Sequence, residues 1–221
     1  MDLEEVIDGN RFVSAGYHVV AARAWKKHGQ DEFKQSPLAY AAFEYRCALE
    51  RVVLELYRVM HEELPEVEEI SKIDSFSSLV SLVHELAGGN ARLLYRVLKF
   101  NSIVSEFTAS VLGKTFSVPD VGKLHDFWGK TSKYCHRQIS PDESWDSVSW
   151  LQKGYKLLDE VDAYLNHLLV DHRVGSVHEK EMPPEVIEAK RAFVEEKIDQ
   201  EQLRTRLKIM EPILTSRLMR K

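Results

Sequence analysis

Apolar residues recur at spacings of three and four through nearly the whole chain, which is the pattern of amphipathic helices that turn one face to a core. The longest stripe covers residues 36–64, where Ser36 and Pro37 supply an N-cap and a first-turn proline. Its apolar members are Leu38, Ala41, Ala42, Tyr45, Ala48, Leu49, Val52, Val53, Leu56, Val59, Met60 and Leu64. No segment sustains the alternation of a β-strand, so the pattern predicts an all-α protein.

Caps and breakers divide the rest of the chain into further helices. Asp74 or Ser75 and Asn90 are candidate N-caps, and Gly113 is a candidate helix end. The sequence Ser140–Glu143 has the form of a capping box. The expected helices lie at about 12–29, 76–86, 90–113, 119–135 and 140–168, with a long one from 185 in which Pro212 forms a kink or an end.

These elements predict one up-and-down helical bundle over residues 1–170, a linker over 171–184 and a C-terminal helix over 185–221. The last helix carries an apolar stripe that must be buried, because each leucine-sized side chain stabilises by ~1.5–3 kcal/mol when it leaves water. Since the bundle closes without this helix, the stripe favours a homodimer in which the helix takes part. The stripe consists of Ile187, Val194, Ile198, Leu203, Leu207 and Met210.

Composition narrows the class of protein. The chain has 221 residues, with 44% hydrophobic and 29% charged, which is typical of a globular domain. It contains no run of about 18 apolar residues, and its acidic start is unlike a secretory signal, so we expect no membrane association. Cys47 and Cys135 form no CxxC pair and indicate free thiols in a reducing compartment. The composition therefore favours a cytoplasmic protein.

A basic segment stands out in an acidic chain of net charge −5. Residues 91–140 hold eight Lys and Arg against three Asp and Glu, and a local positive field attracts phosphates. On a helical wheel, four residues of this segment share the border of the apolar face: His125, Gly129, Ser132 and His136. The cations Lys123, Lys133 and Arg137 beside them are candidate nucleic-acid ligands; a solvated helix face is the alternative.

Motifs for nucleotides, metals and cofactors are absent, so the sequence predicts no cofactor and no metal site. One weak match is His125-Asp126, which has the form of the dyad in HD-domain metallophosphohydrolases. Such a site needs another histidine and aspartate, for which His84 and either Asp159 or Asp162 are the candidates.

Two stretches resemble the HEPN superfamily of small helical bundles. One is residues 45–53, with Arg46 and Glu50 on an amphipathic helix, and the other runs from Lys130 to Arg137 before the last bundle helix. The resemblance covers about residues 36–170. Many HEPN proteins are metal-independent ribonucleases with an R-x4-6-H motif, in which Arg orients phosphate and His transfers protons. Lys130 and His136 occupy the matching place here, with lysine instead of arginine.

Two functions from different classes follow. The first is a HEPN-like module that binds protein or nucleic acid without catalysis. The second is a metal-independent ribonuclease of toxin or defence type with His136 and Lys130 as its catalytic residues. An HD-type metallophosphohydrolase is a third and weaker hypothesis.

Overall fold

The computed structural model describes residues 14–61, 75–86, 89–113, 115–135, 148–171 and 182–219. Over these ranges the protein is helical and contains no strand, which confirms the all-α prediction. A π-helical turn, His167–Asp171, follows α8. The helices are α2 (Ala15–Gly29), α3 (Gln35–His61), α5 (Phe76–Leu86), α6 (Ala91–Leu112), α7 (Val121–Cys135), α8 (Val148–Asn166), α9 (Pro184–Val194) and α10 (Gln200–Leu218).

The chain divides into two compact units that differ from the predicted domains. Unit 1 comprises residues 1–53 and 120–170, and unit 2 comprises residues 54–119 and 171–221. The predicted core over 36–170 is therefore shared between the units, and α3 contributes residues to both. Each unit joins segments that are distant in sequence, which periodicity along the chain cannot indicate.

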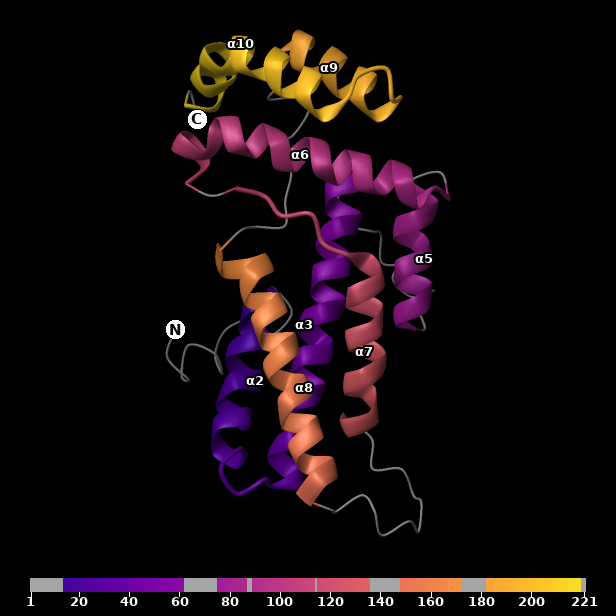
Figure 1. Cartoon of the computed structure of the whole chain (residues 1–221), viewed down its shortest axis with the longest axis vertical. Coiled ribbons are helices and arrows are strands. Elements are labelled where there is room, and N and C mark those ends of the chain that lie inside the picture. Colours follow the sequence, from indigo (N-terminus) through magenta and orange to yellow (C-terminus); the bar gives the residue numbers. More distant parts are fainter. Residues whose placement is uncertain are drawn as a thin grey trace. The chain divides into compact units, whose positions relative to one another are not determined.

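Unit 1 is built on the predicted stripe of α3. The stripe residues from Leu38 to Val53 are all fully buried, as the periodicity requires. Helix α8 packs against both α2 and α7, and the four helices of this unit lie side by side (Figure 1). Buried Leu158, Val161 and Leu165 form the core-facing stripe of α8. By contrast Val148, the first residue of α8, is 59% exposed.

Several helix ends follow the predicted local chemistry. The Asn90 side chain accepts hydrogen bonds from the backbone N–H groups of Arg92 and Leu93, at 2.9 and 3.3 Å. Gly113 ends α6 with a φ of 71°, a conformation that glycine adopts without a steric penalty. Ser75 caps α5 by accepting from the Ser78 N–H at 3.1 Å. The predicted capping box at 140–143 lies outside the described residues.

The predicted long C-terminal helix is instead two helices. In unit 2, α9 and α10 pack on α6 and on each other (Figure 1). Between them Glu196 takes a φ of 64°, and Asp199 and Gln202 then form a capping box that starts α10. Of the two alternatives predicted for Pro212, a kink or an end, the end is wrong, since α10 continues through it to Leu218.

The apolar stripe proposed for the homodimer is used inside the chain. Leu203 and Leu207 are fully buried in one cluster with Phe100 and Ile103 of α6. Ile187 and Met210 pack against the same cluster. Packing of this segment on its own chain therefore removes the reason first given for a dimer.

Candidate functional site

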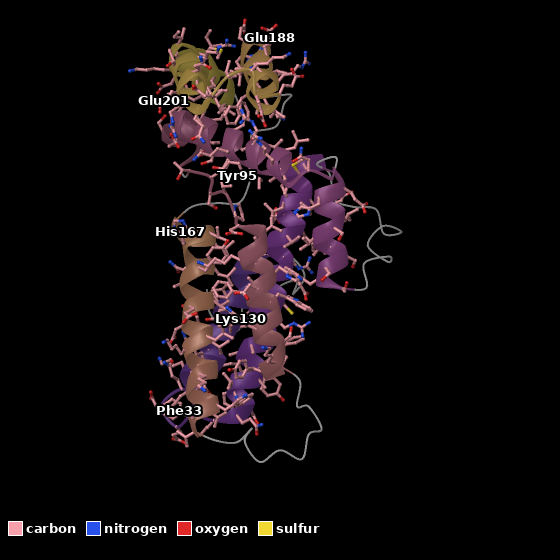
Figure 2. The ribbon with its side chains drawn as sticks, turned by 45° about the vertical axis from the view of Figure 1, so that its right-hand side comes forward. Phe33, Tyr95, Lys130, His167, Glu188 and Glu201 are labelled. Atoms are coloured by element: carbon pink, nitrogen blue, oxygen red, sulfur yellow. The ribbon has the colours of Figure 1, made fainter. Side chains whose placement is uncertain are left out.

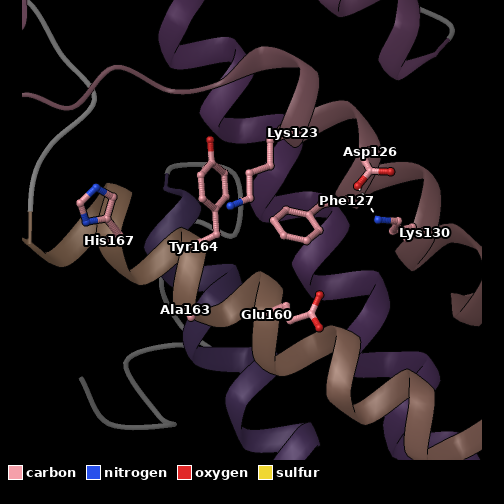
Figure 3. A pocket seen from close by; sticks show the side chains of 8 residues that line it. All are labelled: Lys123, Asp126, Phe127, Lys130, Glu160, Ala163, Tyr164 and His167. Carbon is pink, nitrogen blue, oxygen red and sulfur yellow. Dashed lines mark hydrogen bonds and ion pairs between the residues drawn. The ribbon is translucent and has the colours of Figure 1, made fainter.

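An open groove of about 660 Å³ runs between α7 and α8 within unit 1 (Figure 3). Lys123 and Lys130, both predicted site residues, lie one above the other on α7, because seven residues make nearly two helical turns. The lining residues are Lys123, Asp126, Phe127, Lys130, Glu160, Ala163, Tyr164 and His167. The groove thus combines cations, carboxylates and aromatic rings on two helices.

One end of the groove is cationic and aromatic. The ammonium group of Lys123 lies 4.6 Å from the ring centroid of Tyr164 and 5.5 Å from that of Phe127. The two rings are 5.6 Å apart, and the Tyr164 hydroxyl accepts a hydrogen bond from the Asp120 N–H at 3.0 Å. Burial raises the pKa of Tyr164; the hydrogen bond from the Asp120 N–H partly opposes this, and the charge of the Asp120 carboxylate adds to it. His167 lies at this end, in the π-helical turn (Figure 3).

The other end of the groove carries one more negative charge than positive charges. Lys130 pairs with Asp126 one turn earlier, at 2.6 Å, and both side chains are about half exposed. Glu160 of α8 lies across from them (Figure 3). With histidine neutral, the lining holds two positive and two negative charges. This balance differs from the basic surface that the charge of residues 91–140 predicted.

The remaining predicted ligands are Lys133, His136 and Arg137. Lys133 is exposed on α7 but does not line the groove. His136 and Arg137 lie outside the described residues, so their predicted roles stay predictions. Lys123 and Lys130 are the two predicted site residues that the groove brings together.

The described residues do not form the metal site that the HD-type hypothesis requires. His125 is exposed on α7, and not half buried as the helical wheel indicated. Asp162 accepts from Arg23 Nε at 2.7 Å and from the Tyr45 hydroxyl at 2.9 Å, while Asp159 pairs with Lys26 at 2.8 Å. Within the described residues, no three His, Cys, Asp or Glu side chains gather closely enough to hold a metal ion. The proposed aspartates instead hold α2, α3 and α8 together.

A polar cluster that the sequence analysis missed lies on the α3 side of α7. The Arg46 guanidinium stacks 4.4 Å from the Trp128 ring centroid, and Trp128 Nε1 donates to Glu50 Oε1 at 2.8 Å. Burial raises the pKa of the Cys135 thiol, while the charge and hydrogen bond of Arg46 partly oppose this. Residues 45–53 and 130–135 thus meet at this cluster, through Arg46 and Cys135. Periodicity placed Arg46 and Glu50 on one face of α3, but it did not indicate which helix this face meets.

Residues of α8 were also missed. Glu160, Tyr164 and His167 recur at spacings of four and three, so the sequence shows that they share a helix face. The sequence contains no signal that this face meets Lys123 and Phe127 of α7. Such a pairing depends on which helices become neighbours.

None of the described helices is long and apolar enough to cross a membrane. Comparison of the chain with models of known protein families, with curated proteins and with solved structures finds no match. The candidate site therefore stands on its own geometry.

Proposed function

We propose that this protein is a binding module whose α7–α8 groove holds a segment of a partner protein. The lining of the groove is the observation that supports it. Lys123 lies beside two aromatic rings at one end, and Glu160 lies at the other. A peptide with an acidic side chain, an apolar side chain and a basic side chain would match these groups. Such polar groups beside an apolar floor fix the orientation of a ligand.

The charge balance favours peptide over nucleic acid. Nucleic-acid affinity comes largely from Lys and Arg that neutralise phosphates. In this groove a continuous phosphate backbone would meet the carboxylates of Asp126 and Glu160. The Lys130 charge is already compensated by Asp126 at 2.6 Å. A dipolar segment of protein avoids this repulsion.

A peptide selection tests the proposal. Random 12-residue peptides would be selected on the full chain, and their affinities measured by fluorescence anisotropy. We expect the selected peptides to contain both an acidic and a basic side chain. They should bind about tenfold more weakly to Lys123→Gln and to Glu160→Gln, because a charge-assisted hydrogen bond contributes ~1.5–3 kcal/mol. Lys27→Gln, the same charge change as Lys123→Gln at an exposed residue of α2 that does not line the groove, is the matched control for the lysine variant.

Two results would refute the proposal. One is a set of selected peptides whose affinity is unchanged in both groove variants. The other is a 12-nucleotide RNA that binds the chain more tightly than any peptide and depends on Lys123. The second result would favour the nucleic-acid module instead.

We retain the metal-independent ribonuclease as the second candidate because of one contact. Arg46 lies against Cys135, and His136 follows Cys135 directly in the sequence. An arginine from α3 is thus available beside the C-terminal end of α7, next to the segment that holds the expected motif, which supports the proposed relationship to that superfamily. Cleavage of single-stranded RNA in EDTA that is lost in both His136→Ala and Arg46→Lys is the expected result, with Arg51→Lys as the control. Cleavage that needs added Mn²⁺ would contradict it.

We also propose a cytoplasmic location and a homodimer. Cys47 and Cys135 are both free thiols, which suits a reducing compartment. Since the stripe first assigned to the dimer is buried within the chain, this homodimer would use a surface other than that stripe.

A further inference from the structure

Two charges in the α7–α8 groove form no ion pair within the part of the chain that the structure describes. They are the ammonium group of Lys123 and the carboxylate of Glu160, and both residues are exposed. Lys130 and Asp126, which also line the groove, pair with each other at 2.6 Å. Lys123 and Glu160 are therefore the two charges that a bound segment can compensate without breaking an existing ion pair.

These two charges lie about one helical turn apart along the groove. The Lys123 ammonium is 4.6 Å from the ring centroid of Tyr164, so it lies at the level of that ring. Glu160 precedes Tyr164 by four residues of α8, which is a rise of about 6 Å along the helix axis. The ring of Phe127, 5.6 Å from that of Tyr164, adds an apolar surface beside them. A bound segment must therefore present two opposite charges on one side, about 6 Å apart.

The groove offers side chains, and the main chain behind them is already hydrogen-bonded. Its lining residues all belong to α7, to α8 or to the π-helical turn, where backbone groups bond within the helix. Figure 2 shows two of them, Lys130 and His167, on these helical elements. The start of α7 is closed as well, because the Lys123 N–H donates to Asp120 Oδ1 and the Asp120 N–H donates to the Tyr164 hydroxyl, each at 3.0 Å.

We propose that the partner segment binds in this groove as an α-helix, an inference that rests on the proposed function. A helix satisfies its own backbone N–H and C=O groups, so it needs none from the groove. Acidic and basic side chains three or four residues apart then lie on one face, separated by about one turn. The acidic side chain pairs with Lys123, the basic one pairs with Glu160, and an apolar side chain between them covers the aromatic rings.

An extended segment would meet the same two charges with a different spacing. Side chains on one face of a strand are two residues apart, a rise of about 6.6 Å. The backbone groups that such a segment turns toward α7 and α8 would lose water without gaining a partner, which is unfavourable. The spacing between the acidic and the basic residue therefore reports the bound conformation.

Peptides selected on the full chain from the random 12-residue library provide the first test. The acidic and basic residues of the tightest binders should lie three or four positions apart. The tightest peptide, resynthesised with the same composition but with these two residues two positions apart, should bind about tenfold more weakly, because one charge then leaves the groove. On Lys123→Glu, the same peptide with its acidic residue replaced by lysine should recover most of the affinity.

Proline provides the second test. One proline in the middle of the peptide should weaken binding about 100-fold, because it removes a helical hydrogen bond and clashes with the preceding turn. Proline at the first helical position is the matched control and should be tolerated. A covalent staple across one turn should strengthen binding about tenfold if the free peptide is about 10% helical, since only that fraction is competent to bind.

The outcomes separate this inference from the proposed function. Selected peptides with the two charged residues two positions apart, or a central proline without effect, would overturn helical binding while the groove remained a peptide site. Peptides whose affinity is unchanged in both Lys123→Gln and Glu160→Gln would refute the proposed function and the helix with it. Dependence on both groove residues, together with the loss caused by central proline, would support both.

Discussion

Two glycines in unit 1 have the same secondary structure but different surroundings. Gly154 lies in the middle of α8, and a Cβ added there would meet Leu38 Cδ2 and Tyr134 Cε1, each at 2.7 Å. Gly129 lies in α7, and a Cβ added there would meet nothing within 4 Å. Replacing each glycine by alanine thus separates the cost of a close helix approach from the general effect of glycine in a helix.

The expected magnitudes follow from two terms. Alanine is better than glycine in a helix interior by ~0.8–1 kcal/mol, and this gain is the same at both positions. At position 154 the added methyl group overfills a packed seam, because Leu38 is fully buried and cannot move aside, which costs ~1–3 kcal/mol. We therefore expect Gly129→Ala to stabilise by ~0.8–1 kcal/mol. The free energy of unfolding of Gly154→Ala should be ~1–3 kcal/mol lower than that of Gly129→Ala.

Urea denaturation followed by circular dichroism measures both free energies of unfolding. The comparison requires equal m values, so that the change in midpoint reports stability alone. For a chain of this length, 1 kcal/mol corresponds to about 2–4 °C in melting temperature, which calorimetry can check. If Gly154→Ala proves as stable as Gly129→Ala, the close approach of α8 to Leu38 and Tyr134 is wrong.

Two further predictions concern buried groups in unit 1. Asp162→Ala leaves the hydroxyl of buried Tyr45 without its acceptor and should lower the free energy of unfolding by ~2–3 kcal/mol. Asp159→Ala removes a half-exposed carboxylate and should lower it by at most ~1 kcal/mol. Equal losses in urea denaturation would contradict the interhelical role of Asp162. Burial raises the pKa of Cys47 to about 12, so iodoacetamide should modify it far more slowly at pH 8.5 in the native chain than in guanidinium, as measured by mass spectrometry. Because the folded pKa is raised, this group's contribution to stability should fall as the pH rises from about 9 toward 12; rapid native modification would refute the burial.

The candidate site was only half visible in the sequence. The positive charge of residues 91–140 pointed to Lys123, the motif comparison pointed to Lys130, and both line the groove. The same reasoning expected a basic surface, whereas α8 contributes Glu160 and makes the lining neutral. A charge count along one segment leaves out the charges that a helix distant in sequence adds to the same surface.

The C-terminal region shows how a local signal was overlooked. The apolar positions from Ile187 to Met210 were interpreted as one helix, although the step of five residues from Ile198 to Leu203 shifts the apolar face by about 140°. Asp199 and Gln202 have the spacing of a capping box and could have indicated the break. Packing on α6 also favours the break, because Phe193 and Leu203 then reach the same core from two helices.

The sequence by itself determined the helical class, the buried stripe of α3 and the ends of α6 at Asn90 and Gly113. These features depend on hydrogen bonds and side-chain spacings within about four residues, so the chain encodes them locally. Only the tertiary structure decided that α7 meets α8 along Lys123 and Tyr164, and that residues 54–119 join residues 171–221 in one unit. Those pairings depend on how whole helix faces bury apolar area against each other, and residues far apart in the sequence supply the two faces.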